Sequence, residues 1–161
     1  MKKEYKIFIF GLFLLFIQSS FILRDITFII PDFITVYIIA LFFWIYQQDL
    51  KKALIFSFIF SILQDMMLPN INFFNFFSKT LIILFILSIK NKFLFKNIYL
   101  KSLVALVCFI IEIVAKDIFI FFRTSLFEFP FTEHILYILL NLLVFYAFYI
   151  FNKGLGEIGK G

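Results

Sequence analysis

The sequence predicts an all-α integral membrane protein, a single domain built as a bundle of six transmembrane helices with short loops and both termini in the cytoplasm. Three observations support this prediction. Hydrophobic residues make up 64% of the 161 positions. They gather in six apolar stretches, each near the length that a helix needs to cross about 30 Å of hydrocarbon. The lysines fall almost entirely in alternate breaks between these stretches.

The six stretches follow one another closely, and the breaks leave no room for an extramembrane domain. They run over 7–23, 26–46, 53–68, 73–89, 98–122 and 134–151. A helix rises 1.5 Å per residue, so about 17 to 25 residues cross a bilayer with some tilt. We therefore expect one helix per stretch, in one transmembrane domain that covers residues 1–161.

The first stretch follows two lysines, as the apolar part of a secretory signal does. A cleavage site needs small residues at set positions. Ser19 and Ser20 are small, but Phe21 and further apolar residues follow them directly. Because the apolar run continues past any plausible cut, we expect the first helix to be retained.

The second stretch is interrupted by Pro31. From Phe33 to Tyr46 alone the helix would be only about 21 Å long. Either residues 26–30 add a turn that bends at Pro31, or the helix is short and the bilayer thins around it. A five-span arrangement, in which one terminus changes sides, is the alternative. The third stretch, 53–68, is also short.

The last three stretches differ in the charges they carry. The fourth, 73–89, contains one lysine, and the fifth, 98–122, contains three charged residues beyond its first turn. The sixth, 134–151, contains only His134, which has no spaced metal ligands. We expect this histidine to lie at the membrane interface.

The basic residues set the predicted orientation, because Lys and Arg near span ends are retained in the cytoplasm. With the N-terminus inside, eleven of the fifteen basic residues fall on the cytoplasmic side. They are Lys2, Lys3, Lys6, Lys51, Lys52, Lys90, Lys92, Lys96, Lys101, Lys153 and Lys160. An anionic inner leaflet thus explains the net charge of +5, and we expect the partner of this surface to be the lipid bilayer and no nucleic acid.

Charged residues inside an apolar stretch need partners, since an unpaired charge in hydrocarbon is costly. Asp32 follows Pro31 at the start of a helix, so we expect its carboxylate to cap free backbone N–H groups. Asp65 ends a helix, where the helix dipole disfavours a carboxylate. Lys79 on the next helix is its predicted partner. A partner-binding patch and a hydrated cavity are the alternatives.

The fifth stretch carries Glu112, Lys116 and Asp117. Glu112 and Lys116 are four residues apart with the acid first, the spacing of a pair on one helix face. We expect them to pair with each other. Contact with a partner helix and proton or ion transport are the alternatives. Asp117 points partly away from Glu112 and is expected to meet Arg123 or another helix.

The sequence contains no pattern typical of catalysis. It has no HExxH, no Ser/His/Asp order, no paired cysteines and no glycine-rich phosphate loop. The single cysteine, Cys108, lies within an apolar run and has no partners for a disulfide or a metal site. We expect no enzymatic activity, no cofactor and no metal.

Three short motifs resemble the MreD family of bacterial rod-shape-determining membrane proteins. They are Pro31-Asp32 opening the second stretch, Gln64-Asp65 closing the third, and the turn with Asn70, Asn72 and Asn75 that follows. Length, six spans and orientation also fit, so the resemblance covers nearly the whole chain. Family members commonly have Gly around this turn and in the neighbouring spans. This chain has none there.

The resemblance implies a non-enzymatic scaffold of the cell-elongation machinery, which directs peptidoglycan synthesis at the bacterial inner (cytoplasmic) membrane. Such a subunit docks an MreC-like single-span protein, and so links MreB filaments to a RodA-type synthase and its transpeptidase. On this reading, Asp32 and Asp65 would lie on a docking face at the outer leaflet. Glu112 with Lys116 would order the fifth helix.

The alternative function belongs to a different class, the substrate-binding subunits of energy-coupling-factor vitamin transporters. These are also small, six-spanning and apolar, but they need a polar pocket near the outer face. Arg24, Asp65, Lys79 and Arg123 could line such a pocket. An otherwise unassigned membrane scaffold is the third possibility.

Overall fold

The computed structural model describes residues 3–20, 31–67, 74–90, 97–124 and 130–158. This part of the chain forms six α-helices and one π-helical turn and contains no strand. The prediction of an all-α protein is therefore confirmed. The first outer loop with Arg24, the turn with Asn70 and Asn72, and the side chain of Arg123 lie outside the described residues.

Each described α-helix falls on one of the six apolar stretches. The helices are α1 (Lys3–Ser19), α3 (Phe33–Ala40), α4 (Leu50–Met67), α5 (Phe74–Lys90), α6 (Ile98–Thr124) and α7 (Phe131–Ile158). A π-helical turn, η1 (Leu41–Ile45), directly continues α3. The larger differences from the predicted bounds are at the first two helices and at the end of α7, which finishes at Ile158 rather than at residue 151. α1 starts at Lys3 rather than at residue 7, because the polar residues before the apolar stretch are helical too. It ends at Ser19 rather than at residue 23.

The second helix starts at Phe33, because Asp32 is its N-cap and has an extended backbone. A helix running unbroken from residue 26 through Pro31 is therefore wrong. Whether residues 26–30 add a turn lies outside the described part of the chain. With η1, this helix covers thirteen residues, Phe33–Ile45, or about 20 Å.

One helical stretch among the described residues, Phe131–Phe151, is long and apolar enough to cross a membrane by length and composition. Phe33–Ile45 is a shorter apolar helix. α1 and α5 have 17 residues each, and α6 carries the three charged residues noted above. Six membrane crossings with both termini inside thus stay a prediction.

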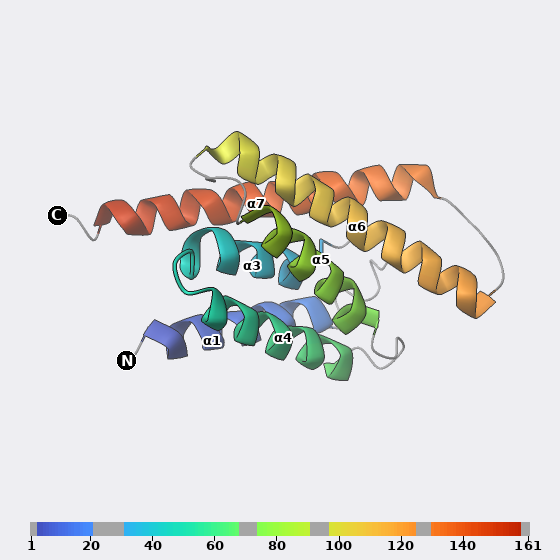
Figure 1. Ribbon diagram of the computed structural model, residues 1–161, viewed down its shortest axis with the longest axis horizontal. Coiled ribbons are helices and arrows are strands. Elements are labelled where there is room, and N and C mark those ends of the chain that lie inside the picture. Colours follow the sequence, from blue (N-terminus) through green and yellow to red (C-terminus); the bar gives the residue numbers. More distant parts are fainter. Residues whose placement is uncertain (1–2, 21–30, 68–73, 91–96, 125–129, 159–161) are drawn as a thin grey trace.

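The short α3 lies at the centre of the bundle (Figure 1). Its residues from Ile34 to Ala40 are all fully buried. α3 contacts α1, α4, α6 and α7. In addition, α4 packs against α5, α5 against α6, and α6 against α7. The sequence explains this position, because α3 with η1 carries no charge between Phe33 and Ile45.

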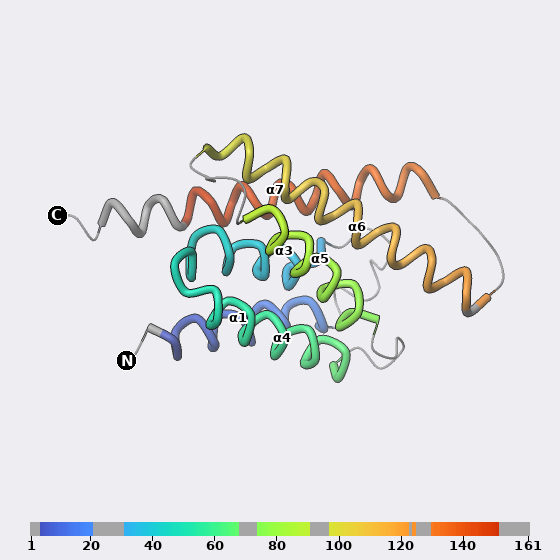
Figure 2. The backbone as a smooth tube through the Cα atoms, in the orientation of Figure 1, coloured from blue at the N-terminus to red at the C-terminus, as the bar shows by residue number. Residues whose placement is uncertain are grey.

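Successive helices run in opposite directions, as the tube in Figure 2 shows. α1, α4 and α6 begin at the end of the bundle where α3, α5 and α7 finish. We call this end, with Lys51, Lys52, Lys90 and Lys101, the lysine end. Asp32 and Asp65 lie toward the opposite end, where α3 begins and α4 finishes.

Large aromatic side chains fill the space between α1, α3 and α4. Phe60 is fully buried and packs edge-on against Tyr37, with ring centroids 5.4 Å apart. Gly11 allows this packing, since a Cβ there would lie 2.2 Å from Phe60 Cζ. The Tyr37 hydroxyl donates to the Ile7 carbonyl at 2.6 Å. α1 is thus held against the core by both close packing and a hydrogen bond.

Candidate functional site

A network of buried polar side chains lies inside the bundle and starts at Asp32. Its Oδ1 accepts hydrogen bonds from the backbone N–H groups of Ile34 and Thr35, each at 3.0 Å. The predicted capping role is therefore confirmed. The other oxygen, Oδ2, accepts from Gln64 Nε2 at 3.1 Å and lies 2.5 Å from Lys79 Nζ. Asp32 thus both starts α3 and binds a buried cation.

Lys79 joins two carboxylates from different helices. Its ammonium pairs with Asp32 and with Oε1 of Glu112. The Lys79 side chain is 0% exposed, and those of Asp32 and Glu112 are 10% and 6% exposed. Because charges at such depth are costly alone, the three groups stabilise one another only as a set.

Two hydroxyl groups complete the hydrogen bonding of Glu112. Thr35 Oγ1 bonds to Oε1 and Tyr137 OH bonds to Oε2, both at 2.8 Å. A further contact comes from α1, where Gln18 Oε1 accepts from the Ile34 N–H at 3.3 Å. All six described α-helices therefore contribute to one network. Its residues are Gln18, Asp32, Thr35, Gln64, Lys79, Glu112 and Tyr137.

Asp65 does not have the predicted role. Its carboxylate accepts from the backbone N–H groups of Asn75 and Phe76, at 2.9 and 2.8 Å. These groups belong to the first turn of α5, whose positive dipole end favours an anion. The negative pole at the end of α4 is thus offset by the neighbouring helix. The expected pairing of Asp65 with Lys79 is wrong, because Lys79 pairs with Asp32 and Glu112.

The expected pair of Glu112 with Lys116 is also wrong. Glu112 points into the core toward Lys79, whereas Lys116 is exposed on the surface of α6. Asp117 reaches another helix, since its Oδ1 lies 3.4 Å from Nε2 of His134 at the start of α7. Of the six candidates, the structure brings together Asp32, Lys79 and Glu112. Asp65, Lys116 and Asp117 lie outside this network.

The docking role expected for the two aspartates stays a prediction, and the structure shows which groups of this chain their carboxylates bind. Asp32 is buried in the network, and both oxygens of Asp65 bind the start of α5. Each carboxylate is therefore occupied within the chain.

Gln18, Thr35 and Tyr137 were not among the site residues predicted from the sequence. The sequence contains a signal for Tyr137, because Tyr137 and Asn141 are polar residues one helical turn apart in the first half of a largely apolar stretch. Asn141 is fully buried, and its Nδ2 donates to the Tyr137 carbonyl. Such a spacing marks a helix face that turns toward a polar interior.

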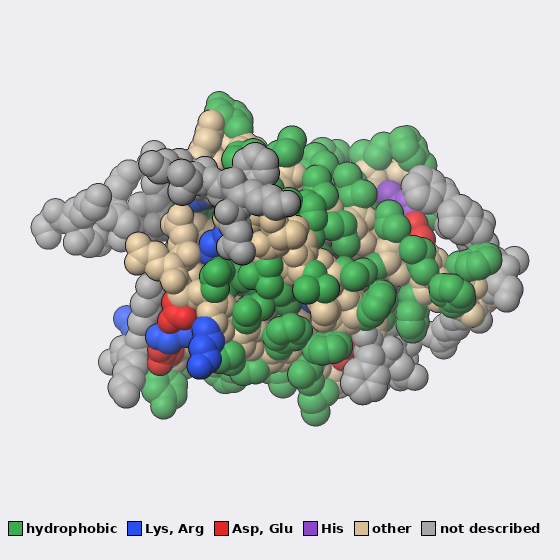
Figure 3. Space-filling view, viewed as in Figure 1, with side chains coloured by type: hydrophobic (Ala, Val, Ile, Leu, Met, Phe, Trp, Pro, Cys, Tyr) green, Lys and Arg blue, Asp and Glu red, His purple; other side chains and the backbone are tan. Residues whose placement is uncertain are grey.

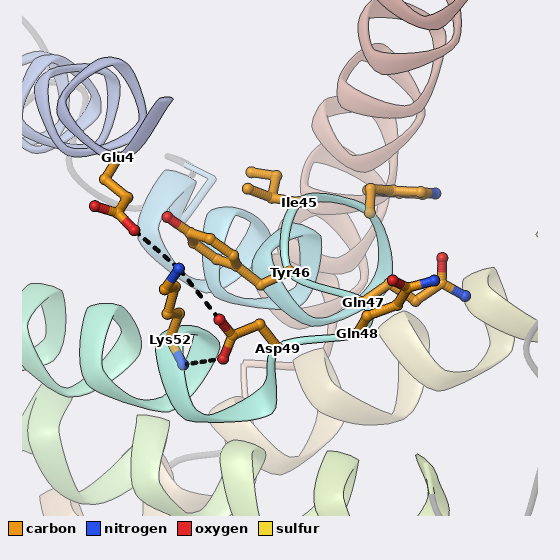
Figure 4. A pocket seen from close by; sticks show the side chains of 8 residues that line it. Glu4, Ile45, Tyr46, Gln47, Gln48, Asp49 and Lys52 are labelled. Carbon is orange, nitrogen blue, oxygen red and sulfur yellow. Dashed lines mark hydrogen bonds and ion pairs between the residues drawn. The ribbon is translucent and has the colours of Figure 1, made fainter. Parts of the chain in front are cut away.

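A separate pocket of about 640 Å³ opens at the lysine end (Figure 4). Lys52 lies there between two acids, 2.9 Å from Glu4 Oε1 and 3.3 Å from Asp49 Oδ2. The backbone N–H of Lys52 bonds to Asp49 and holds the pKa of that carboxyl below its usual range. Hydrogen bonds to Glu4 and Asp49 raise the pKa of Lys52. This surface pairing ties α1 to the start of α4.

Two lysines bind carbonyls in and just after the π-helical turn η1 at the same end. Lys90 Nζ donates to the Phe42 and Gln47 carbonyls, each at 2.9 Å. Lys101 Nζ lies 3.5 Å from the Phe43 carbonyl and 5.5 Å from the centre of the Trp44 ring. Cations are favoured near carbonyls that a helix end leaves without partners. These lysines therefore have a structural reason to lie at this end.

The described residues include no group of three or more His, Cys, Asp or Glu side chains that could hold a metal ion. Cys108 is buried in the core. No family model, curated protein or solved structure matches this chain.

Proposed function

We propose that this chain is a non-enzymatic scaffold of the bacterial inner membrane, resembling MreD, that serves the cell-elongation machinery. In this role its six helices cross the bilayer with both termini in the cytoplasm. It docks an MreC-like single-span protein and, through it, links MreB filaments to a RodA-type synthase and its transpeptidase. The proposal rests on the motifs around Asp32 and Asp65 and on the distribution of polar and apolar groups.

The observation that supports the proposal most strongly is that Asp32, Lys79 and Glu112 lie inside the bundle while large apolar side chains are exposed on its outside. Exposed fractions reach 67% at Phe16, 66% at Leu143 and 80% at Phe122, on three different helices. In Figure 3, hydrophobic side chains spread over the visible face, and acidic and basic ones gather mainly at one end. A contiguous apolar surface of this kind fits lipid rather than water.

The ends of the bundle support the proposed orientation. Lys51, Lys52, Lys90 and Lys101 share one end, and this is the end that the positive-inside rule assigns to the cytoplasm. Asp65 and His134 lie toward the other end. The two sides of the bundle thus differ in charge as the proposal requires.

The interior favours a scaffold over a transporter subunit. The carboxylates of Asp32 and Glu112 and the ammonium of Lys79 bind one another and their neighbours. A substrate site needs polar groups that face a cavity instead. The pocket described above lies at the lysine end, whereas a vitamin site would lie near the outer face.

Purification from the native membrane tests this function. The tagged full-length protein is extracted in mild detergent, and its companions are identified by mass spectrometry. We expect an MreC-like single-span protein, with or without the RodA-type synthase and its transpeptidase. An unrelated multi-span protein carrying the same tag is the control. Recovery of an ATPase module with a bound vitamin would contradict the scaffold and support the transporter alternative.

A further inference from the structure

We propose that the centre formed by Asp32, Lys79 and Glu112 is a proton-binding site that holds one exchangeable proton on Oε2 of Glu112. The ligand is thus a hydrogen ion, bound where six helices meet. This inference does not depend on the scaffold function, because it rests on the charges and hydrogen bonds of the interior alone.

The first argument is the charge of the centre. Two carboxyl groups face one ammonium group, and the side chains of Lys79, Asp32 and Glu112 are 0%, 10% and 6% exposed. The other titratable groups that face Glu112 are Tyr137 on α7 and Cys108 on α6 itself, and neither can add a positive charge. Two ionised carboxylates would leave one negative charge uncompensated. A buried charge without a partner is costly, and a proton removes it.

The second argument decides which carboxyl group carries the proton. The four partners of Asp32 are two backbone N–H groups, the Gln64 amide NH₂ and the Lys79 ammonium, all of which donate. As they are oriented, these four groups accept no hydrogen bond from Asp32; Oε1 of Gln64 points away from it and has no partner among the described residues. A proton on Asp32 would therefore displace a donor. Asp32 fits its surroundings as a carboxylate.

Glu112 has a different set of partners. Its Oε1 binds the Lys79 ammonium and the Thr35 hydroxyl, while its Oε2 has the Tyr137 hydroxyl as its partner among the described residues. A hydroxyl group both donates and accepts. A protonated Oε2 can thus donate to Tyr137, and no other hydrogen bond of the centre is lost. The geometry places the proton between Glu112 and Tyr137.

The surroundings of Tyr137 agree with this assignment. When its oxygen accepts from Glu112, its own hydrogen needs another acceptor. Asn141 lies one turn further along α7 and is 0% exposed. Its Oδ1 is a buried acceptor that makes no hydrogen bond within the described part of the chain. Asn141 thus carries a buried acceptor without a partner among the described residues, one turn from Tyr137 on the same helix.

Infrared spectroscopy of the full-length protein in mild detergent tests the proposal, because a protonated carboxyl group has a C=O stretch separate from that of a carboxylate. At neutral pH we expect one such band. It should shift when glutamate is labelled with ¹³C, stay in place when aspartate is labelled, and disappear at alkaline pH. No protonated band at neutral pH, or a band that follows the aspartate label, would overturn the proposal.

Variants provide the second readout. Glu112→Gln should fold and lose the band, while Glu4→Gln, which changes an exposed carboxylate at the lysine end, should keep it. A band that persists in folded Glu112→Gln contradicts the proposal. If Glu112→Gln does not fold, the isotope experiment decides alone. Replacing sodium by choline should change neither the band nor the melting temperature. Stabilisation by sodium without a band would mean that a metal cation balances the charge, and it would also overturn the proposal.

Discussion

Lys79 shows how a single charged residue can be tolerated in an apolar interior. Its ammonium is fully buried and has two carboxyl groups as partners, one at the start of α3 and one in the middle of α6. Removing a residue from such a set leaves the remaining charges unbalanced, which costs more than the net value of the pairs. Removing an exposed lysine should change the free energy of unfolding much less.

Lys79→Met is therefore expected to destabilise the protein by about 3–5 kcal/mol, since it leaves two carboxyl groups facing each other in the core. Lys116→Met is the matched control, because it removes an exposed lysine from α6 and should change stability by less than about 0.5 kcal/mol. Unfolding of both variants in mixed micelles measures the difference. Equal losses would contradict the network.

A second prediction at this scale separates the two aspartates. Asp65→Ala removes the cap of α5 and should cost about 1 kcal/mol, whereas Asp65→Asn keeps most of the cap. In double-mutant cycles, Asp32 and Lys79 should couple by about 0.5–3 kcal/mol. Asp65 and Lys79 should show no measurable coupling. If the coupling energy between Asp65 and Lys79 were as large as that between Asp32 and Lys79, the pairing first expected from the sequence would be correct.

The sequence predicted the role of Asp32 as a cap but not its partner. A cap depends on neighbours in the chain, and Pro31-Asp32 before an apolar helix contains that information. A pairing between helices depends on which faces meet. Lys79 has roughly the right depth for either aspartate, and only the packing of α3 against its neighbours decides between them. Glu112 and Lys116 likewise have the spacing of a pair, but Glu112 binds the buried ammonium of Lys79 instead.

At the scale of helices, the contact between α1 and α4 depends on one missing side chain. Gly11 faces the ring of Phe60, and a Cβ at this position would lie 2.2 Å from Cζ. The ring cannot easily move away, because it is fully buried and packs against Tyr37 and Phe8. The two helices can approach this closely only because residue 11 is glycine.

Gly11→Ala is therefore expected to destabilise the protein by about 1–3 kcal/mol, although alanine favours a helix more than glycine does. Phe60→Leu shortens the opposing side chain and should recover part of this loss in the double variant. Thermal unfolding in detergent measures all three variants. If Gly11→Ala raises the melting temperature in the wild-type background, the close contact between α1 and α4 is wrong.

At the scale of the whole molecule, the bundle has apolar side chains on its outside and an ionic network at its centre. The apolar stretches predicted the number of described α-helices and most of their bounds, because long hydrophobic runs between polar breaks leave few other structures. The central place of α3 was not predicted. α3 can lie there because the sequence from Phe33 to Ile45 is uncharged, so other helices can cover every face of this short helix.

The measurement that tests this account most directly is the side of the membrane on which each end of the bundle lies. Single cysteines are introduced as Tyr5→Cys and Lys51→Cys at the lysine end and as Thr132→Cys at the other end, all at exposed positions. An impermeant thiol reagent is then applied to intact and to lysed spheroplasts. Cys108 is buried and serves as the unreactive background.

Six crossings with both termini inside predict that the cysteine at 132 reacts in intact spheroplasts and that those at 5 and 51 react only after lysis. Labelling of the cysteine at 5 in intact spheroplasts, with 51 still protected, would support five crossings instead. Equal labelling of all three positions would contradict a membrane-spanning bundle and, with it, the scaffold proposed for this chain.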